Sequence, residues 1–320
     1  MKELPFAFPP IEAYQGFSFI MGVVLAYPNL EKVRFNKYIN LQCMETNNLA
    51  KMNLVFTDTL WDEYRLAGLA EMNLYDVANF DKTTLESFLC ERLDQGNYLL
   101  LYDIDEYYIS YSDNYKKRHY NHDVYIFGYT QDMFHVLAYR QDHLTGMYIR
   151  KEEVLDSLLS NQAFKKIEMQ RDFCTFRPVF HKNVKLDRKV IRKEVKNYLQ
   201  EKPGTKKENR IYGIGVYRIL LDGLELLYKT RNLNYLDMRP FRCLMEHKNL
   251  MFDRVKRVLK AEQGLIDKAK QMVENAEIIF RLLQKYNMSF DTKYLDKAQL
   301  RLQDLWQEDR LWCEDFLSRT

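Results

Sequence analysis

The sequence predicts an α+β unit over residues 1–150, followed by an α-helical unit over residues 151–320. In the first half, short segments are either wholly apolar or alternate apolar and polar residues, which is typical of strands. After residue 150 the apolar residues recur at helical spacing. The chain is also longer than one average domain of ~100–150 residues, which favours two structural units.

Composition excludes several classes of protein. Hydrophobic residues make up 47% of the chain and charged residues 29%, so the sequence is neither disordered nor collagen-like. The 48 basic and 45 acidic residues leave a net charge of +3, which is too balanced for a general nucleic-acid binder. The five cysteines are scattered and never occur as CxxC, which indicates neither a disulfide framework nor a zinc ribbon and favours a reducing, cytoplasmic location.

The most apolar segment is residues 16–27. It is shorter than the ~20 residues that span a bilayer, and no small-residue cleavage site of a signal peptide follows it. We therefore expect a buried central helix and no membrane association.

Further elements of the first half follow from local patterns. Thr83 and Glu86 form a capping box that opens a helix, and Gly96 closes it. Residues 98–104 are apolar on both faces, as in a central strand. The remaining expected elements are strands at 38–44 and 52–56, a tyrosine-rich loop at 105–121, and strands at 122–129 and 134–139 that pair antiparallel through a turn at 130–132.

The second half is expected to be helical. Predicted helices cover residues 151–159, 186–199 and 212–228, with a polar connector at 201–210. Apolar residues then recur at three-, four- and seven-residue steps, which predicts one long helix over 250–285, either in a bundle or in an antiparallel pair with 294–316. The apolar face that these residues form packs either within the monomer or across the interface of a homodimer.

Two residues suggest chemistry. Ser18 lies in the first turn of the central helix, and His122 opens a later strand. If they face each other, a proton could pass from the hydroxyl to the imidazole, as acyl transfer requires. Alternatively, Ser18 is an ordinary helix-start serine and His122 an ordinary strand-end histidine.

Residues 96–108 and 115–129 resemble the second half of the catalytic domain in the butirosin biosynthesis protein H family. In that family a strand ends in an acidic-aromatic motif, and a loop leads to a strand of the form found at 122–129, His-Asp-Val-Tyr-Ile-Phe-Gly-Tyr. Residues 212–217 and 239–248 resemble relatives from bacterial peptide-antibiotic gene clusters, which have an extended helical C-terminal half. The resemblance implies a papain-like fold over residues 1–150.

The resemblance also implies an activity. Active members of the family transfer an acyl group from a carrier-protein thioester to an amine, using a cysteine at the start of the central helix, the strand histidine, and an acidic or amide residue on the next strand. His122 matches the histidine. Residues 15–19 contain Ser18 but no cysteine, so Ser18 and Cys43 are both candidate nucleophiles. The resemblance places the third residue of the site near Ala138 or Tyr139, and neither side chain can orient an imidazole as a carboxylate does.

The expected partners are an acyl or peptidyl carrier protein, which would itself hold the phosphopantetheine, and an amine acceptor. No cofactor of the chain's own is expected. Asp105, Tyr108 and Tyr115 are expected to shape the substrate cleft, and the basic runs 116–118 and 202–210 could receive an acidic carrier helix.

Other motifs do not indicate a site. His119 and His122 lack a third ligand at zinc spacing, and Gly213 and Gly215 lack the strand and third glycine of a dinucleotide fingerprint. Three functions stay open: an amide-forming acyltransferase of specialised-metabolite biosynthesis, an inactive relative that binds a carrier protein as a scaffold, and a peptidase or amidase.

Overall fold

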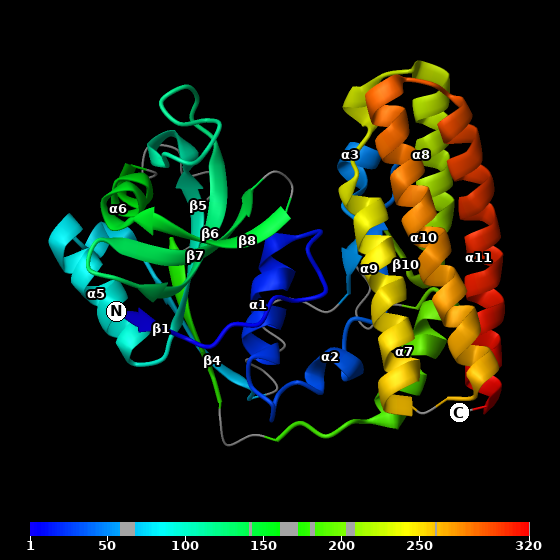
Figure 1. The fold of residues 1–320 in the computed structure, drawn as a ribbon, viewed down its shortest axis with the longest axis horizontal. Helices are drawn as coiled ribbons and strands as arrows, with labels where there is room; N and C mark the ends of the chain where they lie inside the picture. The colour runs from blue at the N-terminus through cyan, green and yellow to red at the C-terminus, as the bar shows by residue number, and fades with distance from the viewer. Residues whose placement is uncertain are drawn as a thin grey trace. The chain divides into compact units, whose positions relative to one another are not determined.

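A computed structural model defines the fold (Figure 1). The structure describes residues 1–57, 68–140, 143–160, 172–179, 183–202, 209–259 and 261–319. The chain mixes helices and strands, and its C-terminal region is helical, as the α+β class predicts.

The chain forms two compact units, each built from separate stretches of sequence. Unit 1 contains Met1–Pro9, Gln15–Glu31 and Leu60–Asn183. Unit 2 contains Pro10–Tyr14, Lys32–Thr59 and Val184–Thr320. This division differs from the expected single boundary at residue 150, because strands far apart in the sequence pair with each other in both units.

Unit 1 is organised around an antiparallel sheet. In the described part of the chain this sheet has seven strands in the order β4-β9-β5-β6-β7-β8, with β1 on β6. The strands are β1 (Lys2–Glu3), β4 (Ala70–Tyr75), β5 (Tyr98–Asp105), β6 (Asn121–Tyr129), β7 (Met133–Arg140), β8 (His143–Arg150) and β9 (Phe173–Pro178). The late strand β9 lies between β4 and β5, which brings residues beyond 150 into this unit.

The hairpin of β6 and β7 confirms the expected antiparallel pairing. Tyr125 is opposite Leu137, and the Thr130 amide donates to the Met133 carbonyl to close the turn. Glycine is required at position 128, where β1 pairs with β6, because a Cβ there would lie 2.7 Å from the Lys2 carbonyl oxygen.

Three helices pack on this sheet: α1 (Gln15–Leu25), α5 (Lys82–Asp94) and α6 (Lys151–Ser160). Helix α1 is buried along nearly its whole length, as its apolar sequence predicts. Its Phe19 ring stacks on Tyr125 of β6 with centroids 4.9 Å apart. Helix α5 begins two residues earlier than the Thr83 and Glu86 capping box predicts, because Asp81 and Thr84 cap each other reciprocally instead.

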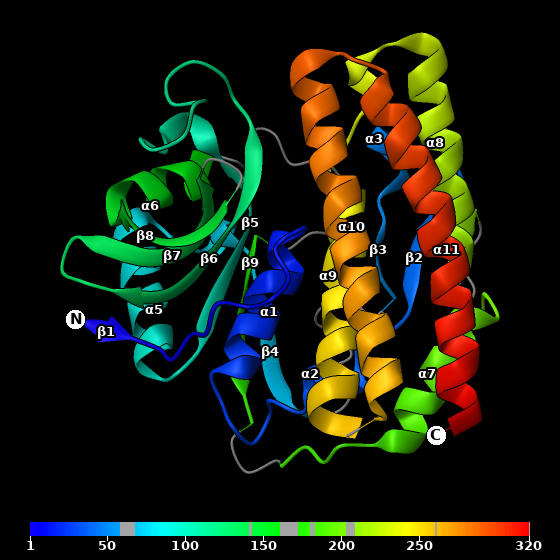
Figure 2. The same cartoon turned by 45° about the vertical axis from the view of Figure 1, so that its right-hand side comes forward.

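Unit 2 contains a small sheet and most of the helices (Figure 2). The sheet order is β10-β2-β3, and the pairing of β10 with β2 joins residues near 211 to residues near 43. The elements are α2 (Val33–Asn36), β2 (Leu41–Met44), α3 (Leu49–Met52), β3 (Val55–Phe56), α7 (Arg188–Leu199), β10 (Arg210–Tyr212), α8 (Val216–Thr230), α9 (Arg239–Asp253), α10 (Gln263–Ser289) and α11 (Lys293–Arg319). Residues 203–208 of the expected polar connector lie outside the described residues.

The prediction of one helix over 250–285 is wrong. Helix α9 ends at Asp253, a π-helical segment covers Arg254–Leu259, and α10 starts anew at Gln263. Arg254 has no exposed surface, and its guanidinium donates to the carbonyl oxygens of Phe35 and Lys37, each at 2.8 Å. The buried cation thus ties the end of α9 to α2 at the point where the helix changes its winding.

The long helices of unit 2 enclose one fully buried charged network. Lys248 of α9 donates to Asp309 of α11, and the hydroxyls of Tyr198 and Tyr217 donate to the same carboxylate at 2.6 and 3.1 Å. Helices α10 and α11 lie side by side and antiparallel, as expected for the last two segments (Figures 1 and 2). Among the described helices, none is both long enough and apolar enough to cross a membrane.

Candidate functional site

The end of β5 brings an acidic segment next to His122. Leu101 pairs with Val124, but the next pair is Ile104 with His122, so β5 contains a bulge at residues 102 and 103. Asp103 has a left-handed backbone there, with φ of 50°. The 3₁₀ turn η2 (Glu106–Tyr108) follows the strand directly, so Glu106 lies beside the start of β6.

The side chains of Glu106 and His122 are paired. His122 Nδ1 lies 3.0 Å from Glu106 Oε1, and the other carboxylate oxygen accepts hydrogen bonds of 2.6 Å from Ser112 Oγ and from Asn114 Nδ2. The imidazole is 42% exposed and the carboxylate 14% exposed. A half-exposed histidine is therefore held by a nearly buried acid that is itself fixed by two neutral donors.

The electrostatics favour a charged Glu106. Burial raises its pKa, but the hydrogen bonds from His122, Ser112 and Asn114 outweigh burial, so the pKa lies below its usual 4.5. An ionised carboxylate accepts the Nδ1 proton of a neutral imidazole, which leaves the lone pair on Nε2. This is the arrangement of a histidine base with an orienting acid.

Glu106 is the partner that sequence reasoning missed. The third member of the site was expected near Ala138 or Tyr139 on the following strand. Tyr139 instead lies alongside His122, with ring centroids 6.4 Å apart, and the ring of Tyr120, just before β6, lies 6.3 Å from that of His122. The available signal was strand pairing, because an acid just after β5 must lie near the start of β6 if the two strands form a hairpin.

A second histidine, His119, forms a similar pair, and 47% of its side chain is exposed. His119 Nδ1 lies 2.6 Å from Asp105 Oδ2. Asp105 is 1% exposed, and its other carboxylate oxygen accepts the backbone amides of Tyr107 and Tyr120. The sequence predicts a substrate contact for Asp105, but the structure encloses its carboxylate, so it fixes the loop that leads to His122.

Both candidate nucleophiles are sealed. Ser18 and Cys43 have no exposed surface. Ser18 lies within α1 of unit 1, whereas Cys43 lies in β2 of unit 2, and burial raises the pKa of the Cys43 thiol to about 12. A hydroxyl without access and a buried protonated thiol cannot attack a bound acyl group.

The other predicted binding residues belong to the same loop. Tyr108 packs edge-on against Tyr107, and Tyr115 is partly exposed with the Lys116 ammonium 5.1 Å from its ring centre. Lys116, Lys117 and Arg118 are all exposed. The basic run thus lies directly before the two histidines in the sequence and on the surface.

The described residues contain no group of three or more His, Cys, Asp or Glu side chains that could hold a metal ion. No protein-family model matches the sequence, and no curated protein matches it.

Proposed function

We propose that unit 1 is a papain-like relative of the thioester-dependent acyltransferases and that it forms amides by direct transfer, with His122 as base and Glu106 as its orienting acid. The observation that carries this proposal is the His122–Glu106 pair, in which the acid is held and the imidazole is half exposed. A buried helix, α1, packed against an antiparallel sheet that bears the histidine supports the papain-like assignment.

Direct transfer needs no enzyme nucleophile, in agreement with the burial of Ser18 and Cys43. The amine nitrogen bonds to the thioester carbonyl carbon while His122 Nε2 removes a proton from that nitrogen. The carbon–sulfur bond then breaks, and the imidazolium returns the proton to the departing thiolate. General base catalysis of this kind contributes ~10²–10⁴-fold.

The donor we propose is an acyl or peptidyl group on a carrier protein in cytoplasmic specialised-metabolite biosynthesis. Carrier-protein surfaces of acidic character would meet the exposed cations Lys116, Lys117 and Arg118 beside the site. The five cysteines are all unpaired, which suits a reducing compartment.

A second candidate function rests on the same burial. An inactive relative would retain the fold and the carrier-binding surface but have no accessible nucleophile. In this chain, the candidate nucleophiles Ser18 and Cys43 are both fully buried. It would act as a scaffold. A peptidase or amidase would use His122 with water as acceptor.

The test is amine-dependent consumption of a panel of acyl thioesters. We expect His122→Ala to lose ~10²–10⁴-fold of the parent rate, because the base is removed. Glu106→Gln should lose less, since the imidazole remains but is no longer held by a charge. Ser18→Ala and Cys43→Ala should keep the parent rate.

His119→Gln is the matched control, because it changes the neighbouring imidazole while keeping a donor for Asp105. Equal rates for the parent and His122→Ala across the panel, with carrier-protein binding retained, would leave the scaffold function. Consumption that proceeds equally without amine would indicate hydrolysis instead.

A further inference from the structure

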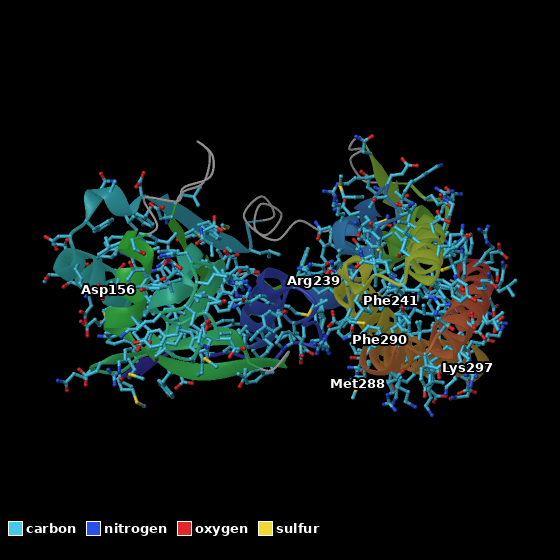
Figure 3. All side chains as sticks on the ribbon, turned by 90° about the horizontal axis from the view of Figure 1, so that it is seen from above. Asp156, Arg239, Phe241, Met288, Phe290 and Lys297 are labelled. Carbon is cyan, nitrogen blue, oxygen red and sulfur yellow. The ribbon has the colours of Figure 1, made fainter. Side chains whose placement is uncertain are left out.

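The turn between α10 and α11 exposes two apolar side chains. Met288 is 83% exposed and Phe290 is 59% exposed. Phe290 follows the last residue of α10 and has a left-handed backbone, with φ of 59°, while its amide donates to the Tyr286 carbonyl. The turn lies at one end of the helical hairpin in unit 2, where Figure 3 labels both residues.

Phenylalanine is an unfavourable residue at this position. Helices commonly end in a left-handed residue, but that residue is usually glycine or asparagine, because a Cβ crowds the backbone there. An aromatic side chain normally compensates by burying its ring, yet most of the Phe290 ring is exposed. Neither backbone conformation nor packing within the described chain explains this choice.

Basic residues outnumber acidic ones in the sequence on either side of the two apolar residues. Residues 281–301 contain five basic residues and two acidic ones, Asp291 and Asp296. Lys285, Lys293 and Lys297 are all exposed around the turn. Asp291 pairs with Lys293 at 2.6 Å and also interacts electrostatically with Lys297. Lys297 lies near the start of α11, which begins at Lys293 just after the turn.

We propose that this turn binds an anionic lipid surface, with Met288 and Phe290 entering the headgroup region and the three lysines contacting the acidic headgroups. Exposed apolar side chains flanked by lysines are the pattern of interfacial membrane binding. A turn that projects its side chains from the end of a hairpin fits a planar surface, whereas a protein groove would need a longer apolar face. The binding is peripheral and reversible, since only two side chains insert.

Flotation with lipid vesicles tests the proposal in the full chain. We expect binding to vesicles of phosphatidylcholine mixed with phosphatidylserine, and not to phosphatidylcholine alone. The double variant Met288→Ser/Phe290→Ser should abolish binding. Replacing Lys285, Lys293 and Lys297 by Gln should weaken it about fivefold per lysine, at ~1 kcal/mol for each basic residue near the surface.

Leu311→Ser is the matched control, because Leu311 is 62% exposed on α11 away from the turn. It should bind as the parent does. Phe290→Gly should bind less yet melt at a higher temperature, because glycine relieves the left-handed backbone. No binding to the anionic vesicles, equal loss in the Leu311 control, or a concentration-dependent dimer that the double variant abolishes would each overturn the proposal.

Discussion

The two units pair their charged side chains in opposite ways. In unit 2, Lys248 is 0% exposed and Asp309 is 3% exposed, and the hydroxyls of Tyr198 and Tyr217 donate to the same carboxylate oxygen, Oδ2, as the Lys248 ammonium. In unit 1, His122 keeps 42% of its side chain exposed while Glu106 is held from behind by Ser112 and Asn114. In both pairs the acid accepts hydrogen bonds from three side chains, and the pairs differ in how exposed the basic side chain is.

That difference separates a structural pair from a chemical one. A buried pair whose cation and carboxylate are both enclosed fixes how helices pack, but no substrate can reach it. A pair with an immobile acid and an accessible imidazole can exchange a proton with a bound molecule. We therefore assign stability to the Lys248 pair and function to the His122 pair, and the following substitutions test that assignment.

The largest effect is expected in unit 2. Lys248→Met leaves the Asp309 carboxylate buried with two tyrosine hydroxyls but no cation, which should lower the free energy of unfolding by ~3–5 kcal/mol. Chemical denaturation measures this loss. The double variant Lys248→Met/Asp309→Leu should recover much of it, because no charge then stays buried. A single variant as stable as the parent would show that the pair does not hold α9 to α11.

An intermediate effect is expected for Glu106→Gln. The folded-state pKa of Glu106 lies below its usual 4.5, so the carboxylate stabilises the fold above that pH and the stabilisation is lost as pH falls through the lower folded value. At neutral pH the variant should lose about 1 kcal/mol, since His122 is partly solvated. Unfolding curves of parent and variant should converge at strongly acidic pH, and a constant difference down to that pH would contradict the hydrogen-bond account.

The smallest effect is expected for an exposed pair. Lys270 and Glu274 of α10 lie 3.5 Å apart one helical turn from each other, with 65% and 50% of their side chains exposed. Lys270→Gln should change the free energy of unfolding by less than ~0.5 kcal/mol, and the change should shrink further in high salt. A loss of unfolding free energy comparable to that of Lys248→Met would contradict the claim that buried ion pairs stabilise the fold more than exposed ones.

Local patterns predicted the elements that depend on neighbouring residues. The apolar run at 16–27 gave helix α1, and the alternation at 122–139 gave the hairpin of β6 and β7. Strand β9 was not predicted, because its place between β4 and β5 depends on partners about 100 and 70 residues away in the chain, which no local pattern encodes. The π-helical segment Arg254–Leu259 was not predicted either, because its apolar residues continue the spacing of an ordinary helix.

The candidate site was predicted in part. His122 was identified, but its acid was sought on the following strand, because the resemblance to the acyltransferase family implies an acidic or amide residue there. The bulge in β5 shifts the register so that Glu106 lies beside His122 instead. Burial of Ser18 follows from the expected buried helix over 16–27, whereas burial of Cys43 was not predictable, because residues distant in the sequence cover its short strand.

The central claim is that His122 acts as an accessible base without an enzyme nucleophile. Intact-mass spectrometry tests it most directly, on protein incubated with an acyl thioester before and after an amine is added. We predict that no acyl adduct forms on the protein without amine and that the same sample consumes the thioester in a His122-dependent way once amine is present. An acyl adduct that forms before amine is added and is lost in Ser18→Ala or in Cys43→Ala would contradict the claim and assign the nucleophile to that residue.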